Sequence, residues 1–170
     1  MNYVSITEPD INNGNGIRAT IWFAGCSHHC KGCHNEWLQN YHLGKDISIL
    51  YEEIVTLFNK KTYLDGITLS GGDPLAQNIN SLVELYEFIE WFKNTFPSKN
   101  IWIFTGYVLE HLIDSNNNDD KLRLKIISLC DYLVDGPFIE ELKDLSLPFR
   151  GSSNQRIIDV DLNKFHWNIE

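Results

Sequence analysis

The chain has 170 residues, of which 43% are hydrophobic and 22% charged; this suits one soluble globular domain, expected to span residues 1–170. Its formal net charge of −9 makes nucleic acids and anionic membrane surfaces unfavourable ligands, so we expect neither as a partner. Residues 1–10 lack the basic and apolar regions of an export signal, and no run of about 18 apolar residues occurs, so the expected location is the cytoplasm.

The first half of the chain contains one strand pattern and two helix patterns. The β-branched and aromatic run at 17–24 predicts a buried strand. Apolar side chains at helical spacing predict amphipathic helices over 47–58 and 82–96. Ser81 and Glu84 have the spacing of a capping box, which predicts the start of the second helix.

Further strand patterns follow in the second half. Short apolar runs closed by small or polar residues predict parallel strands at 66–70, 101–105 and 132–135. A helix is expected over 122–130, and the polar stretch 114–120 is expected to be a loop.

Alternating strands and helices predict an α/β fold with a mostly parallel sheet. A complete eight-fold barrel usually needs about 250 residues, so an incomplete, open-sided (β/α) barrel is the preferred form, with a doubly wound flat sheet as the alternative. In both folds the chemistry lies at the carboxyl ends of the strands, where the motifs described next are found.

The main chemical motif is the loop after the first predicted strand, which reads Cys26-Ser-His-His-Cys30-Lys-Gly-Cys33. In a reducing compartment such clustering favours metal binding over disulfides. Three thiolates hold three irons of a 4Fe-4S cluster and leave the fourth iron open to a small molecule. We therefore expect Cys26, Cys30 and Cys33 to be the metal ligands.

A zinc site is the alternative for this loop. Its fourth ligand would be His28, His29 or His34, and cysteine spacing alone does not exclude it. The more ordinary expectation for His28 and His29 is that they fill the loop and shield sulfur from solvent. The distant Cys130 lies in an apolar run and is expected to be a buried hydrophobic residue.

A second motif, Ser70-Gly71-Gly72-Asp73-Pro74, follows the strand predicted at 66–70. Paired glycines allow the backbone to approach a ligand closely, although such a turn also commonly ends a strand. Asp73 is expected either to accept a hydrogen bond from a ligand ammonium group or to cap the following helix.

The cysteine spacing and the glycine-rich turn resemble those of the radical S-adenosylmethionine (SAM) superfamily. Val134-Asp-Gly-Pro-Phe138 and Arg150-Gly-Ser-Ser-Asn-Gln-Arg156, with Gly32 and Asn35, resemble the activating proteins of anaerobic ribonucleoside-triphosphate reductases. The resemblance covers Asn13 to Ile158. Gly32 departs from the wider superfamily, which often has an aromatic residue there, but agrees with the narrower family.

The resemblance implies cofactors and residue roles. It implies one 4Fe-4S cluster per chain and SAM as the second cofactor. The positions that match SAM-contacting or strand-end rim positions are Gly32, Cys33, His34, Gly71, Gly72, Asp73, Thr105 and Asp135. The stretch 150–156 is expected either to bind SAM, to hold a partner protein, or to form an ordinary turn. Arg18 and Arg156 are expected either to neutralise carboxylates near the site or to be surface charges.

The function that the resemblance implies is reductive cleavage of SAM to a 5′-deoxyadenosyl radical, which abstracts a hydrogen atom from a glycine of the reductase. The implied partners are the large subunit of anaerobic (class III) ribonucleotide reductase and a low-potential electron donor such as flavodoxin. The alternatives are an activase of another glycyl-radical enzyme and a non-catalytic zinc-binding module.

Overall fold

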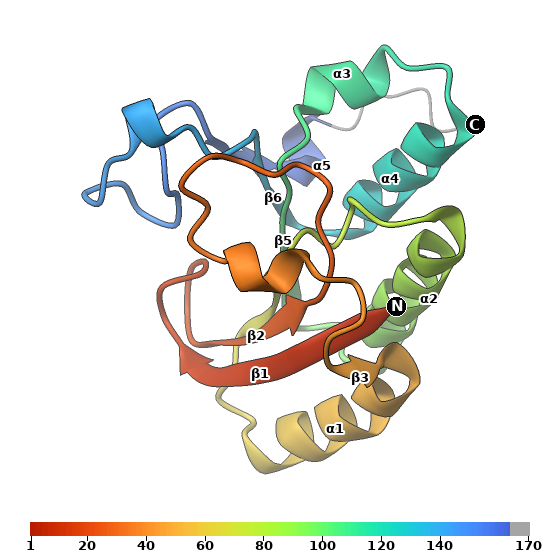
Figure 1. Ribbon diagram of the computed structural model, residues 1–170. Helices are drawn as coiled ribbons and strands as arrows, with labels where there is room; N and C mark the ends of the chain where they lie inside the picture. Colours follow the sequence, from red (N-terminus) through yellow and green to blue (C-terminus); the bar gives the residue numbers. More distant parts are fainter. Residues whose placement is uncertain (164–170) are drawn as a thin grey trace.

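A computed structural model describes residues 1–163 and shows one seven-stranded sheet with helices packed against it (Figure 1). The strands are β1 (Asn2–Asp10), β2 (Arg18–Phe23), β3 (Lys45–Asp46), β4 (Gly66–Gly71), β5 (Asn100–Phe104), β6 (Tyr132–Asp135) and β7 (Arg156–Asp159). The α-helices are α1 (Ile47–Lys60), α2 (Ile79–Thr95), α3 (Leu109–Ile113), α4 (Asn118–Leu129) and α5 (Val160–Asn163). Two 3-10 helices occupy Glu36–Gln39 and Glu140–Leu142.

The centre of the sheet is parallel and its flanks are antiparallel. The strand order is β3-β1-β2-β4-β5-β6-β7, with parallel pairing from β2 through β4 and β5 to β6. β1 pairs antiparallel with β2 and β3, and β7 pairs antiparallel with β6. The predicted α/β class and the parallel centre are confirmed. The sheet does not close, because β3 and β7 end the order without pairing with each other.

One face of the sheet carries the hydrophobic core. Successive side chains of a strand point to opposite faces, so Ala19, Ile21 and Phe23 of β2 lie on the same side as the helices. The helices contribute fully buried side chains at helical spacing, such as Leu50 and Ile54 of α1. Figure 1 shows α1, α2 and α4 along this side and the long loops after β2 and β6 on the other.

Two predicted boundaries were wrong for the same physical reason. α2 begins at Ile79 and is capped by Asn78, whose side chain accepts a hydrogen bond from Ser81 N at 3.0 Å, so Ser81 lies in the first turn and is not the cap. α4 begins at Asn118 inside the expected polar loop, and Asn117 is its cap. Asparagine is as good an N-cap as serine, because its side-chain oxygen satisfies a free amide of the first turn.

The other face of the sheet is polar where its strands begin. Arg18, at the start of β2, is fully buried and donates to Thr68 Oγ1 at 2.7 Å and to Asn100 Oδ1 at 2.6 Å. Burial lowers the pKa of its guanidinium to about 10. A Cβ atom on Gly14 would lie 2.8 Å from the Trp102 ring and 3.0 Å from Arg18 Cδ, so the loop before β2 is packed tightly over both. Arg18 is therefore not a surface charge, and its bonds to a hydroxyl and an amide oxygen lie at the end of β2 opposite the cysteine loop.

None of the helices in residues 1–163 is long and apolar enough to cross a membrane.

Candidate functional site

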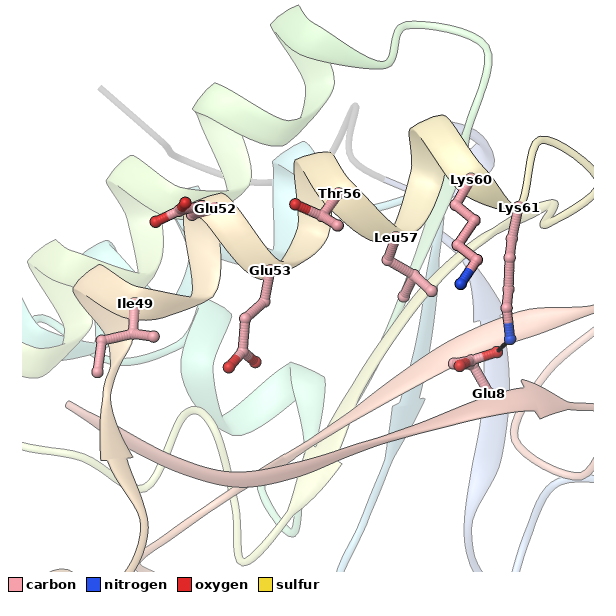
Figure 2. Close-up of a pocket in the computed structure, with 8 residues that line it drawn as sticks. All are labelled: Glu8, Ile49, Glu52, Glu53, Thr56, Leu57, Lys60 and Lys61. Atoms are coloured by element: carbon pink, nitrogen blue, oxygen red, sulfur yellow. Dashed lines mark hydrogen bonds and ion pairs between the residues drawn. The ribbon is translucent and has the colours of Figure 1, made fainter.

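A cavity of about 600 Å³ lies where the parallel strands end. Its walls come from six segments: residues 11–13 before β2, the cysteine loop after β2, the glycine turn after β4, the end of β5, the turn after β6, and residues 143–151. A second hollow of about 560 Å³ lies between the outer face of α1 and β1, where Figure 2 shows the Glu8–Lys61 ion pair. That second hollow contains none of the predicted site residues.

The three predicted metal ligands all line the 600 Å³ cavity as free thiols. Cys26 is buried at the base of its loop, and burial raises the pKa of its thiol to about 11; Cys30 and Cys33 are partly exposed. The loop is folded on itself, since Cys33 N donates to Cys30 O at 3.2 Å and His28 N to Cys26 Sγ at 3.5 Å.

The arrangement of these thiols fits a cluster better than a single ion. No three histidine, cysteine, aspartate or glutamate side chains within residues 1–163 are grouped closely enough to hold one metal ion. A zinc ion needs its ligands to converge on one point at about 2.0–2.3 Å, whereas a 4Fe-4S cluster binds each thiolate to a different iron. The three free thiols line one cavity and supply the three thiolates that the second kind of site needs.

Close packing of the glycine turn against the end of β2 requires glycine at positions 71 and 72. Gly71 has φ +117°, and a Cβ atom there would lie 2.4 Å from Phe23 N. A Cβ atom on Gly72 would lie 2.3 Å from Gly25 O. Since backbone atoms cannot move aside as a side-chain tip can, both positions need glycine. Both residues line the cavity, beside the loop that begins at Cys26.

Asp73 is 2% exposed and its carboxylate is occupied by bonds within the protein. Oδ1 accepts from Leu75 N at 2.7 Å and Ala76 N at 3.3 Å, and this stabilises the turn after β4. The prediction that Asp73 caps the following helix was wrong, because α2 starts six residues later and has its own cap at Asn78. The other oxygen bonds to His28, Thr105 and Gly106.

Of the remaining predicted residues, most lie at the cavity and one does not. Gly32, His34 and Thr105 line it, and Gly32 has φ +69°, which favours glycine at that position. Asp135 is absent from the lining: its carboxylate accepts from Leu109 N at 2.9 Å and from Arg156 Nε at 3.0 Å. Asp135 is thus a correction to the predicted site, because these hydrogen bonds hold its carboxylate against α3 and β7 and outside the cavity lining.

Arg156 neutralises two carboxylates outside the cavity. Besides Asp135, it bonds to both oxygens of Glu110, at 2.8 and 2.6 Å, and these bonds lower the pKa of Glu110 to about 2. The ion pairs of Arg156 with Asp135 and Glu110 therefore join β7 to β6 and α3.

The stretch 150–156 forms a braced loop beside the cavity. Gln155 Oε1 accepts from Gly151 N at 2.9 Å, and its Nε2 donates to Gly136 O at 3.0 Å. Arg150 lines the cavity, and its Nη1 donates to Gln155 O at 3.1 Å. Its Nε is buried with no hydrogen-bond partner, which is costly unless a ligand supplies one.

The charge of the cavity differs from that of the whole chain. Although the chain carries a net charge of −9, the described lining residues include one acid, the internally bonded Asp73, and two permanent cations, Lys143 and Arg150. The cavity can therefore accept a ligand that presents a carboxylate.

Sequence reasoning missed several cavity residues. Trp22 lines the wall and shares a face of β2 with Arg18, so strand alternation could have placed it. Phe104 is the last residue of β5, a position the strand-end argument also covers. The segment 143–149 has no comparable signal, because it lies between the 3-10 helix Glu140–Leu142 and the loop of Arg150 without a periodic pattern.

Comparison with known proteins identifies the family. The family model described as a 4Fe-4S single cluster domain matches residues 12–158. An anaerobic ribonucleoside-triphosphate reductase-activating protein of Haemophilus influenzae is 38% identical over 160 residues, covering 92% of this chain and 97% of that protein. The chain belongs to this family of activating proteins. The Escherichia coli K12 member is 38% identical over 158 residues (91% of this chain, 96% of that protein), and the member from Enterobacteria phage T4 is 34% identical over 157 residues (92% and 93%).

Membership of the reductase-activating family agrees with the geometry of the site. The 4Fe-4S match includes the whole cysteine loop, whose three thiols share one cavity wall. The predicted resemblance is thereby confirmed, and an iron–sulfur cluster is the cofactor that the family model supports.

Proposed function

We propose that this protein activates an anaerobic ribonucleotide reductase by generating a radical on a glycine of the reductase large subunit, with a 4Fe-4S cluster and SAM bound in the 600 Å³ cavity. The observation that carries the proposal is that the three thiols, the glycine turn and the permanent cation Arg150 all line one cavity. The curated relatives are named as activating proteins of that reductase.

The bound cofactors would supply the redox chemistry, which is one-electron reductive cleavage of SAM and abstraction of a hydrogen atom from the glycine. The protein would hold and orient these groups. Cys26, Cys30 and Cys33 would bind three irons and leave the fourth iron available to the amino and carboxylate groups of SAM.

Residues around the thiols would position SAM. The backbone of Gly32 to His34 and of Gly71 to Gly72 is uncovered by large side chains at the cavity wall and can approach the ligand closely. Arg150 would pair with the carboxylate, because it has a buried donor without a partner. Thr105 acts through its bond to Asp73, at 2.9 Å, and supports the turn.

The open sheet suits a macromolecular substrate. An incomplete (β/α) barrel of the radical SAM type would leave its cavity accessible from the side, and the unpaired edges at β3 and β7 are consistent with that form. A flexible segment of the reductase could then reach the cofactors. A low-potential donor of the flavodoxin class would reduce the cluster from outside.

The test is anaerobic reconstitution with iron and sulfide, reduction with dithionite, addition of SAM, and chromatography for 5′-deoxyadenosine. Product formation that is lost in Cys30→Ala would support the proposal, and electron paramagnetic resonance (EPR) should then show a glycyl radical on added reductase. Full product formation by Cys30→Ala would refute the cluster assignment. Stoichiometric zinc and no cluster would favour the zinc-binding alternative. A radical formed only on another glycyl-radical enzyme would show that the partner is that enzyme and not the reductase.

A further inference from the structure

The carboxylate oxygen Asp73 Oδ2 joins three segments that are far apart in sequence. It accepts from His28 Nε2 at 2.8 Å, from Thr105 Oγ1 at 2.9 Å and from Gly106 N at 2.8 Å. Because an ionised carboxylate only accepts, the ring nitrogen of His28 is the donor. One buried oxygen thus connects the cysteine loop, the glycine turn and the end of β5.

The imidazole of His28 is held on its other sides as well. Its ring meets the Tyr107 ring edge-on at 4.7 Å between centroids. A Cβ atom on Gly106 would lie 2.7 Å from His28 Cδ2, so glycine at 106 provides the space that the ring occupies. Tyr107 is in turn covered by the guanidinium of Arg123 at 4.8 Å. The His28 side chain is only 19% exposed.

The segment that carries the thiols needs such a tether. Residues 24–35 contain no helix or strand, so a repeating backbone hydrogen-bond pattern does not fix their position. His28 lies between Cys26 and Cys30, and its bond to Asp73 spans 45 positions of sequence. Two other bonds join this segment to the glycine turn near its two ends: Asp73 N donates to Gly25 O at 2.9 Å, and Asn35 Nδ2 donates to Gly71 O at 3.4 Å. The His28 bond is the one that lies between two of the thiols, and it ends on a charged, buried acceptor.

We propose that His28 is a positioning residue: through Asp73 it fixes the cysteine loop against the glycine turn, and so sets the cluster at the correct place relative to bound SAM. The inference rests on the proposed function for its consequence on SAM, whereas the tether itself concerns contacts within the protein. His28 is not a metal ligand in this proposal.

The test compares two replacements of His28. His28→Gln keeps a nitrogen donor the same number of bonds from Cβ as Nε2, whereas His28→Phe keeps an aromatic ring against Tyr107 and removes the donor. Asp73→Asn replaces one carboxylate oxygen, the acceptor of the His28 bond, by an amide nitrogen. The remaining oxygen can still accept from Leu75 N and Ala76 N in the turn after β4. His29→Asn is the matched control, because His29 is a histidine of the same loop at φ +48°, where asparagine is tolerated. The His29 side chain bonds to Gln39 Oε1 at 2.9 Å and not to the glycine turn, and asparagine keeps a nitrogen the same number of bonds from Cβ as Nδ1.

Three quantities are measured: iron per chain, SAM affinity from the change it causes in the EPR spectrum of the reduced cluster, and amide hydrogen exchange of residues 26–35 in the cluster-free chain. We expect His28→Phe to weaken SAM binding by roughly tenfold, the loss typical of one hydrogen bond to a charged group, and to speed exchange in the loop. His28→Gln should stay close to wild type in both, as should His29→Asn. The double variant His28→Phe/Asp73→Asn should be no worse than Asp73→Asn alone.

Several outcomes would overturn the inference. Wild-type SAM affinity and exchange in His28→Phe would do so, as would equal impairment in His28→Gln and His28→Phe, or additive losses in the double variant. Loss of cluster in His28→Phe but not in His28→Gln would support the inference, because glutamine keeps a hydrogen-bond donor to Asp73 and phenylalanine does not. If the wild-type protein does not bind SAM, the proposed function fails, but hydrogen exchange still tests the tether.

Discussion

Replacing Arg150 by alanine should selectively weaken recognition of the SAM carboxylate. Arg150 makes one hydrogen bond in the structure, to Gln155 O at 3.1 Å, and its buried Nε has no partner. Hydrogen bonds to charged groups contribute about 1.5–3 kcal/mol each, so losing one such bond to the carboxylate should weaken SAM binding by roughly 10- to 150-fold. Because the hydrogen bond of Arg150 ends on Gln155, within its own loop, the variant should keep its fold and its cluster.

The assay is the affinity of the reconstituted protein for SAM and for decarboxylated SAM. Wild type should prefer SAM strongly, because the carboxylate would bind both the open iron and Arg150. Arg150→Ala should lose the roughly 10- to 150-fold part of that preference that Arg150 supplies, while its affinity for the decarboxylated compound changes little. Lys143→Ala is the control, since Lys143 is an exposed cation that lines the same cavity. Undiminished preference in Arg150→Ala would show that the carboxylate pairs elsewhere. Normal SAM binding together with weakened reductase binding would instead indicate that Arg150 binds an acidic group of the reductase.

The remaining predictions concern a thiol, a glycine and an ion pair. Cys130 is 2% exposed and burial raises its pKa, so it should resist alkylation in the native cluster-free chain and react only after unfolding; rapid native labelling would contradict its placement in the core. Gly72→Ala should cost about 1–3 kcal/mol of stability, measured by urea unfolding, because its Cβ would lie 2.3 Å from Gly25 O; an unchanged midpoint would contradict this packing. Bonding to Arg156 lowers the pKa of Glu110 from 4.5 to about 2, so its stabilisation is present above about pH 4.5 and is lost as pH falls towards 2. The urea midpoints of wild type and Glu110→Gln should therefore differ slightly at pH 7 and converge near pH 2, and high salt should reduce the difference because the pair is exposed.

Local patterns predicted the elements of the parallel centre and its covering helices. The fully buried strand β4 is a short run of small and β-branched or apolar residues, and α1 shows its buried face at helical spacing. β1 was not predicted, because much of this antiparallel strand is half-exposed and its sequence, which includes Pro9, is not a clear strand pattern. β3 has two residues, too few for any pattern.

The position of the site was predictable, but the partners of its side chains were not. Parallel strands bring their carboxyl ends to one edge, so the cysteine loop and the glycine turn were expected to meet, and both line the cavity. Asp135 was misassigned because β7 returns antiparallel to β6 and places Arg156 directly opposite it. That pairing depends on tertiary structure, as does the meeting of Asp73 with His28 and Gly106.

The tight packing of Arg18, Trp102 and the loop around Gly14 has a kinetic consequence under the proposed function. These residues fill the sheet where its strands begin, so SAM and the reductase segment would both have to use the cavity that the three thiols line at the opposite ends. A protein segment seated in that cavity would prevent later entry of SAM. Binding would then follow a compulsory order, with SAM first and the reductase second, and each new turnover would have to wait until the reductase withdraws.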